Sequence, residues 1–177
     1  MNLCPAPTRP TAAAVALAAL TASLTWPAPA AAQPSAQVVT QALELATGAA
    51  AALAPPDARV QALAGTLDPR LKLAPCTQVQ PYLPAGSPAW GRTRIGLRCT
   101  QGATAWNVYL PVTVQVLAPA VVATAALPAG ARLDPVQLDT AEIDWAAAPA
   151  PPFTDTQALT GRELARPVAA GQALRPS

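Results

Sequence analysis

Residues Thr104–Leu117, with the sequence TAWNVYLPVTVQVL, alternate between apolar and polar side chains. The apolar face carries Trp106, Val108, Leu110, Val112, Val114 and Val116, and the other face carries Asn107, Tyr109, Thr113 and Gln115. A period of two predicts one long β-strand with a buried face. Because Pro111 has no N–H group, we expect an edge or a bulge on one side of this strand.

The composition limits what the rest of the chain can form. Its 177 residues suffice for one domain or two small ones. With 22 prolines and only 11% charged residues, long helices are not expected beyond the N-terminus. The arginines are dispersed and the formal net charge is +2, which argues against nucleic-acid binding.

The first 32 residues predict a secretory signal peptide. The apolar run Thr11–Leu24 is followed by small residues that end at Ala32, a typical cleavage position. The alternative is an uncleaved N-terminal anchor, although the apolar run is short and rich in alanine for a membrane span. No other segment is predicted to insert stably in a membrane.

Two cysteines, Cys76 and Cys99, follow the predicted signal peptide. In an exported chain a lone pair of cysteines predicts a disulfide. The alternative is two free, buried thiols.

Two segments before the long strand have clear periodicity. Gln33–Leu53 carries an apolar stripe at helical spacing and ends before Pro55-Pro56. We expect a packing helix there in preference to a partner-binding helix. Trp90–Cys99 alternates as a strand, with Cys99 on its apolar face. The opposite face carries Arg92, Arg94 and Arg98, which form either a solvated surface or a docking surface for an acidic partner.

The sequence after Val121 consists of short strands and turns. Leu127–Pro135 aligns without a gap with Val168–Pro176. In each copy a glycine is expected to adopt a positive φ, and a leucine three residues later to anchor the turn in the core. These residues are Gly130 and Leu133 in the first copy and Gly171 and Leu174 in the second.

Three shorter features complete this region. Val121–Ala126 predicts a short strand, and Asp134 with Pro135 and Gln137 predicts a capping box. The segment Ala146–Pro152 predicts a flexible or polyproline-like insertion.

Few residues are suited to catalysis or metal binding. The chain has no histidine, which excludes Ser-His and Cys-His nucleophilic schemes and disfavours a zinc or copper site. No glycine-rich phosphate loop is present. Asp139, Glu142 and Asp144 could act as paired carboxylates in glycoside hydrolysis, but solvated acidic residues are the favoured interpretation. We therefore expect an exported, non-enzymatic binding protein without cofactor or metal.

Several motifs resemble the flagellar basal-body P-ring formation protein (FlgA) family. They are Leu67-Asp-Pro-Arg-Leu-Lys-Leu-Ala-Pro-Cys76, Trp90-Gly-Arg92, Cys99 and Trp106-Asn-Val-Tyr-Leu-Pro-Val112. The segment from Val121 is similar to the SAF module of that family, through Leu127–Leu133, Leu159–Arg162 and Ala170–Leu174.

The resemblance implies a mainly β fold with one N-terminal helix. A small disulfide-stapled β domain, residues 33–118, would be followed by a SAF (β-clip-like) module, residues 119–177. Family members usually continue past the position of Leu174 with further strands, so we expect an incomplete SAF module.

The implied function is that of a periplasmic chaperone that binds flagellar P-ring subunits without ATP. Arg92, Arg94 and Arg98 are the residues we expect to contact the partner. Two alternatives stay open: a SAF-containing pilus-assembly or secretion component, and a carbohydrate-binding module that uses Trp90 and Trp106.

Overall fold

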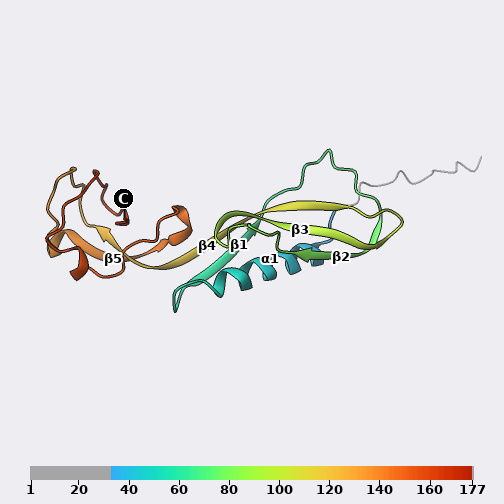
Figure 1. The fold of residues 1–177 in the computed structure, drawn as a ribbon, viewed down its shortest axis with the longest axis horizontal. Helices are drawn as coiled ribbons and strands as arrows, with labels where there is room; N and C mark the ends of the chain where they lie inside the picture. The colour runs from blue at the N-terminus through green and yellow to red at the C-terminus, as the bar shows by residue number, and fades with distance from the viewer. Residues whose placement is uncertain (1–32, 177) are drawn as a thin grey trace, which may run out of the picture. The chain divides into compact units, whose positions relative to one another are not determined.

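The computed structural model describes residues 33–176, so the predicted signal peptide lies outside it. In this part of the chain, the structure contains one α-helix, five strands and three 3₁₀ turns (Figure 1). They are α1 (Ala36–Ala51), β1 (Arg59–Ala64), β2 (Cys76–Tyr82), β3 (Gly91–Gly102), β4 (Asn107–Ala123), η1 (Pro135–Gln137), β5 (Leu138–Asp144), η2 (Trp145–Ala147) and η3 (Gln157–Leu159). The prediction of a mainly β fold with one N-terminal helix is confirmed.

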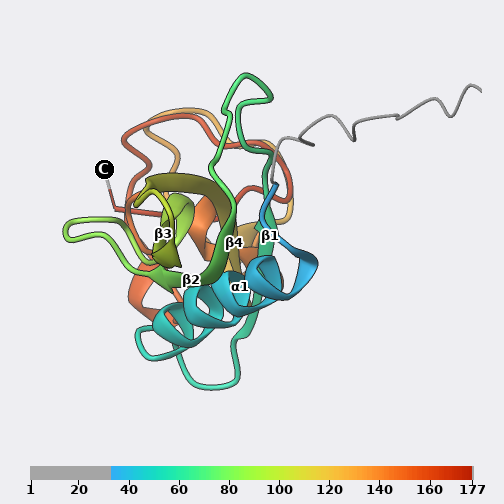
Figure 2. The same ribbon diagram turned by 90° about the vertical axis from the view of Figure 1, so that its right-hand side faces the viewer.

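Helix α1 packs on one face of the sheet (Figures 1 and 2). Its N-terminus is capped by Ser35, whose side chain accepts a hydrogen bond from the backbone N–H of Val38. Its buried residues are spaced four apart and therefore share one face: Ala42, Ala46 and Ala50. The packing interpretation of this helix is confirmed.

Strand β4 is the central strand and is longer than the sequence predicted. The strand expected to end at Leu117 and the short strand expected to begin at Val121 are one continuous element. Its first part lies between β1 and β3, and its second part pairs with β5. Pro119 does not interrupt this second ladder. Because Val121 donates to Phe153 on the side away from β5, the nitrogen of Pro119 two residues earlier faces that side too.

Pro111 lies where strand β1 ends. Its carbonyl accepts a hydrogen bond from Gly65 N at 2.8 Å, one residue beyond the end of β1 at Ala64. The proline nitrogen faces the same side, so its missing N–H falls where the β1 ladder stops. The expected edge beside Pro111 is confirmed.

Strands β2 and β5 were not predicted as such. Strand β2, CTQVQPY, contains Pro81 and shows register shifts near Gln78, so its alternation is broken. Strand β5, LDTAEID, has only one fully buried side chain, that of Leu138. Both strands lie at the margin of the sheet, where a period-two pattern is weakest.

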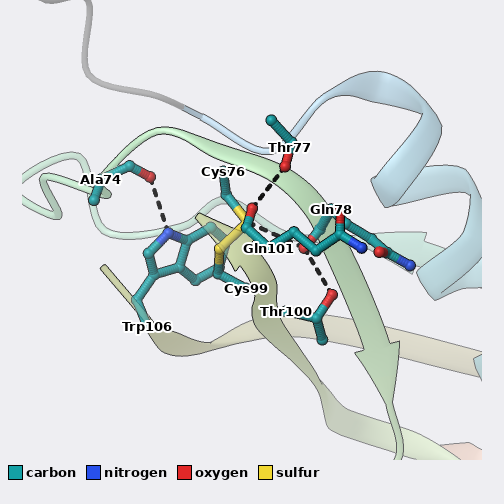
Figure 3. Close-up of a disulfide and its surroundings, with 8 residues drawn as sticks. All are labelled: Ala74, Cys76, Thr77, Gln78, Cys99, Thr100, Gln101 and Trp106. Carbon is teal, nitrogen blue, oxygen red and sulfur yellow. Dashed lines mark hydrogen bonds between the residues drawn. A yellow bond between two sulfur atoms is a disulfide. The ribbon is translucent and has the colours of Figure 1, made fainter. Parts of the chain in front are cut away.

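The predicted disulfide joins Cys76 and Cys99, with their Cα atoms 5.9 Å apart (Figure 3). Beside it, Thr77 Oγ1 donates to Gln101 O at 2.8 Å and Thr100 Oγ1 donates to Gln78 O at 3.1 Å. These bonds tie the start of β2 to the end of β3, across the register shift.

The repeated turns of the C-terminal part pack against each other. Leu127 and Val168 exchange backbone hydrogen bonds of 2.9 and 3.0 Å. Gly130 has φ 80° and Gly171 has φ 76°, and both anchoring leucines, Leu133 and Leu174, are buried. The expectations for both copies are confirmed, as is the capping box at Asp134.

The segment Ala146–Pro152 is not the flexible or polyproline-like insertion that we predicted. It starts within the 3₁₀ turn η2 and then folds around the guanidinium group of Arg175. That group donates to the carbonyl oxygens of Trp145, Ala148 and Ala150, and to that of Asp144. The sequence pattern missed this because the partner cation lies 25 or more residues away.

Candidate partner-binding face

The three predicted binding arginines lie together on the exposed face of β3. Arg92, Arg94 and Arg98 are exposed, whereas Ile95, Leu97 and Cys99 are buried. The alternation of apolar and polar residues in the sequence therefore predicted correctly that these three side chains lie on the exposed face. Since α1 covers the opposite face, the arginine-bearing face is the one left open to a partner.

A glycine in the middle of this face makes room for an aromatic ring. Gly96 pairs with Tyr82 on β2 and with Tyr109 on β4. A Cβ atom at position 96 would lie 2.2 Å from Cζ of Tyr82, so the ring occupies the space that a side chain would need. The absence of a side chain at Gly96 thus allows Tyr82 to lie across the sheet.

Each tyrosine stacks with one of the arginines. Arg94 Cζ lies 4.9 Å from the ring centroid of Tyr109, and Arg98 Cζ lies 5.5 Å from that of Tyr82. Both distances are in the range of cation–π interactions. Gln80 Oε1 accepts two hydrogen bonds from Arg98, of 3.0 and 2.8 Å, which fixes its guanidinium plane. We call this set, Arg92, Arg94, Arg98, Tyr82 and Tyr109, the arginine–tyrosine face.

The two tyrosines also interact with each other. Hydrogen bonding to the Tyr82 side chain is the main cause that raises the pKa of Tyr109 above its ordinary value, and the coulombic interaction with Tyr82 adds to it. The Arg94 cation acts in the opposite direction. Tyr109 therefore stays uncharged at neutral pH, and the face keeps its positive charge.

Among charged side chains, strands β1 to β4 carry only cationic ones. Strands β1 to β4 contain Arg59, Arg92, Arg94 and Arg98 and no Asp, Glu or Lys. Arg59 is neutralised by Glu142, whose Oε1 lies 2.7 Å from its Nη2. The other ion pair within residues 33–176 joins Arg132 and Glu163. The three arginines of β3 are therefore free to meet an acidic group.

The carboxylates considered for catalysis have structural partners instead. Glu142 pairs with Arg59, and Asp144 Oδ1 accepts from Val116 N at 3.0 Å and from Ala146 N at 2.9 Å. Within the described residues, no group of three or more Cys, Asp or Glu side chains could hold a metal ion.

The tryptophans considered for sugar binding are fastened to the backbone. Trp90 Nε1 donates to Ala50 O at 3.2 Å, and Trp106 Nε1 donates to Ala74 O at 2.9 Å. Both rings pack partly buried against the core between α1 and the sheet. Their roles are to hold the end of α1 and the loop before β2.

The C-terminal part contains an open groove of about 730 Å³. Its lining includes the buried apolar side chains of Leu159 and Leu174 and the charged side chains of Arg162, Glu163 and Arg166. The sequence pattern did not indicate this groove, which is lined by Leu133, by residues between 143 and 148 and by residues between 153 and 176.

Two family models match this chain. The model of the FlgA N-terminal domain matches residues 36–116, and the model of the SAF domain matches residues 118–177. The chain belongs to the FlgA family. No curated protein matches the sequence.

Three solved FlgA structures are similar to this chain at low sequence identity. Salmonella FlgA in its closed form is 22% identical with a TM-score of 0.47, over 77% of this chain and 66% of that one. The open form is 20% identical with a TM-score of 0.47, over 77% and 60%. Thermotoga maritima FlgA is 13% identical with a TM-score of 0.41, over 81% and 51%. The chain thus spans less than two thirds of the length of these FlgA proteins.

No helix within residues 33–176 is long and apolar enough to cross a bilayer.

Proposed function

We propose that this chain is a periplasmic chaperone for assembly of the flagellar P ring, which holds ring subunits until they polymerise around the rod. Membership of the FlgA family is the observation that carries the proposal. The predicted signal peptide, residues 1–32, and the Cys76–Cys99 disulfide support an oxidising compartment such as the periplasm. The FlgA N-terminal match also favours this role over that of a pilus-assembly component.

We assign subunit binding to the arginine–tyrosine face. Guanidinium groups bind carboxylates through planar, paired hydrogen bonds, and arginine and tyrosine are enriched at interface centres. Here Arg94 stacks on Tyr109, while Arg98 is held by Tyr82 and Gln80. Less side-chain freedom is then lost on binding, which favours affinity. The expected partner surface on the subunit is acidic.

The proposed activity is holding, without covalent chemistry, nucleotide or cofactor. Surface complementarity between chaperone and subunit would be replaced by subunit–subunit contacts when the ring forms. The carbohydrate-binding alternative loses its support because Trp90 and Trp106 pack on the core.

The test is a binding measurement with purified P-ring subunit. The variant R92E/R94E/R98E should bind at least about tenfold more weakly at low salt, and added salt should weaken wild-type binding. A matched control, R70E/K72E/R166E, changes three exposed cations outside the face by the same total charge. Equal weakening by both variants would mean a general charge effect, and unchanged binding by the first would remove the face from the interface.

A further inference from the structure

The two edges of the sheet differ in how they are protected. Strand β2 forms one edge, where Pro81, the register shifts near Gln78 and the disulfide interrupt a regular ladder. Strand β1 forms the other edge, with the sequence RVQALA and an uninterrupted register against β4. It contains no proline, no lysine and no bulge, which are the usual devices that block edge pairing.

The outward-facing backbone groups of β1 can be assigned. Gly65 N donates to Pro111 O, so residue 65 faces β4. Backbone direction alternates along a strand, so Arg59, Gln61 and Leu63 also face β4 and Val60, Ala62 and Ala64 face outward. No residue of β1 is fully buried. The edge therefore presents three N–H and three C=O groups in the regular spacing that a further strand requires.

The side chains beside this edge indicate the chemistry of its occupant. Leu63 is 58% exposed and lies on the same face as Arg59 and Gln61. The charge of Arg59 is compensated by Glu142. An incoming strand thus meets a neutral edge with one exposed apolar side chain, which suits an uncharged segment with an apolar residue opposite Leu63.

A second copy of this chain fits the edge less well. If two copies of β1 paired antiparallel about a two-fold axis, their outward-facing residues would lie opposite each other. Two registers of this pairing use most of β1. One places Leu63 opposite Gln61 and the other places it opposite Arg59. The register that brings the two Leu63 side chains together pairs only residues 62–64 within the strand.

We propose that the β1 edge accepts an extended, uncharged segment of the protein that this chain holds, by addition of a strand to the sheet. This inference rests on the proposed chaperone function and adds to it a second contact, separate from the arginine–tyrosine face. Main-chain hydrogen bonds would provide affinity while requiring little of the incoming segment's sequence. Leu63 would select for an apolar side chain in that segment.

Hydrogen exchange on the full chain, with and without purified P-ring subunit, tests the proposal directly. In the free chain the amides of Gln61 and Leu63 should be protected, and those of Val60, Ala62 and Ala64 should exchange quickly. With subunit bound, the latter three amides should become protected at least about tenfold. A complex that forms without this protection would overturn the inference and leave the chaperone function standing. Absence of any complex would instead contradict the proposed function.

Two substitutions provide an independent test. A64P removes one outward N–H at an exposed side chain and should weaken subunit binding about tenfold or more, whereas A64V keeps that N–H and should bind as wild type. L63K places a charge at the edge and should weaken binding by a similar factor. Wild-type affinity in L63K together with A64P, or dimerisation of the free chain through β1, would contradict the proposal.

Discussion

Tyr82 on β2 lies over the backbone of Gly96 on β3, in the space where any larger residue would place its side chain. From there the ring stacks with Arg98, and its hydroxyl oxygen accepts a hydrogen bond from Asn107 Nδ2 at 2.8 Å. One missing side chain thus allows an aromatic ring to join β2, β3 and β4 on their exposed face.

Substitution of Gly96 by alanine should displace Tyr82. A Cβ there would lie 2.3 Å from Cε1 of the ring, so the ring must swing away and lose its contacts. We expect a loss of about 1–3 kcal/mol in the free energy of unfolding, measured by urea denaturation. The control is G48A, at a helix position with nothing within 4 Å, which should stabilise the chain by about 0.5–1 kcal/mol. Equal stability of G96A and wild type would contradict the packing role of Tyr82.

Removal of the Tyr82 hydroxyl should lower the pKa of Tyr109 toward its ordinary value of 10.0. The physical reason is that the Tyr82 side chain is the largest cause of the upward shift. The chain has two tyrosines, so Y82F leaves Tyr109 as the single phenol to follow by ultraviolet titration. Wild-type Tyr109 can be followed by carbon NMR. R94A should raise the pKa further, since it removes the cation that lowers it.

The sign of the resulting pH dependence follows from the raised pKa. The folded chain favours protonated Tyr109, so its contribution to stability is present below the unfolded pKa. It is lost as the pH rises through the folded pKa. Identical Tyr109 titrations in Y82F and wild type would contradict the coupling between the two side chains.

Replacement of Arg175 by alanine should loosen the C-terminal part. Its guanidinium group donates hydrogen bonds to the carbonyl oxygens of Asp144, Trp145, Ala148 and Ala150. In the variant these oxygens would lose a charged donor. We expect a loss of about 1.5–3 kcal/mol in unfolding free energy, followed by tryptophan fluorescence. R166A, at an exposed arginine, should change stability by less than about 0.5 kcal/mol. Similar effects of both substitutions would argue against this role of Arg175.

Loss of the disulfide should lower stability by about 3 kcal/mol, because Cys76 and Cys99 close a loop with a sequence separation of 23. The variant C76A/C99A should unfold at lower urea concentration than the oxidised chain. A reducing agent should shift wild type to the same midpoint and leave the variant unchanged. A wild-type midpoint that is insensitive to reduction would contradict the stabilising role.

Much of the sheet could be predicted because its central strands are buried on one face only. The alternation in β3 and β4 identified the buried residues and the exposed Arg92, Arg94 and Arg98. The turn glycines and the disulfide could also be predicted from the sequence, because each depends on a residue type with few conformational or chemical options.

The rest depends on pairing between distant segments. Tyr82 lies in a strand that the sequence pattern did not predict, and only the register that places it opposite Gly96 reveals its part in the arginine–tyrosine face. Likewise, nothing near Ala148 or Ala150 in the sequence indicates that Arg175 would hold their carbonyls. The continuity of β4 across Pro119 was missed because the unpaired side of that proline is known only from the fold.

Electron microscopy of basal bodies purified from a strain that lacks this gene tests the proposed role in P-ring assembly. We expect rods without a P ring in this strain, and we expect the ring to be restored by the 177-residue chain but not by its R92E/R94E/R98E variant. Intact P rings in the deletion strain would contradict a role of this chain in P-ring assembly.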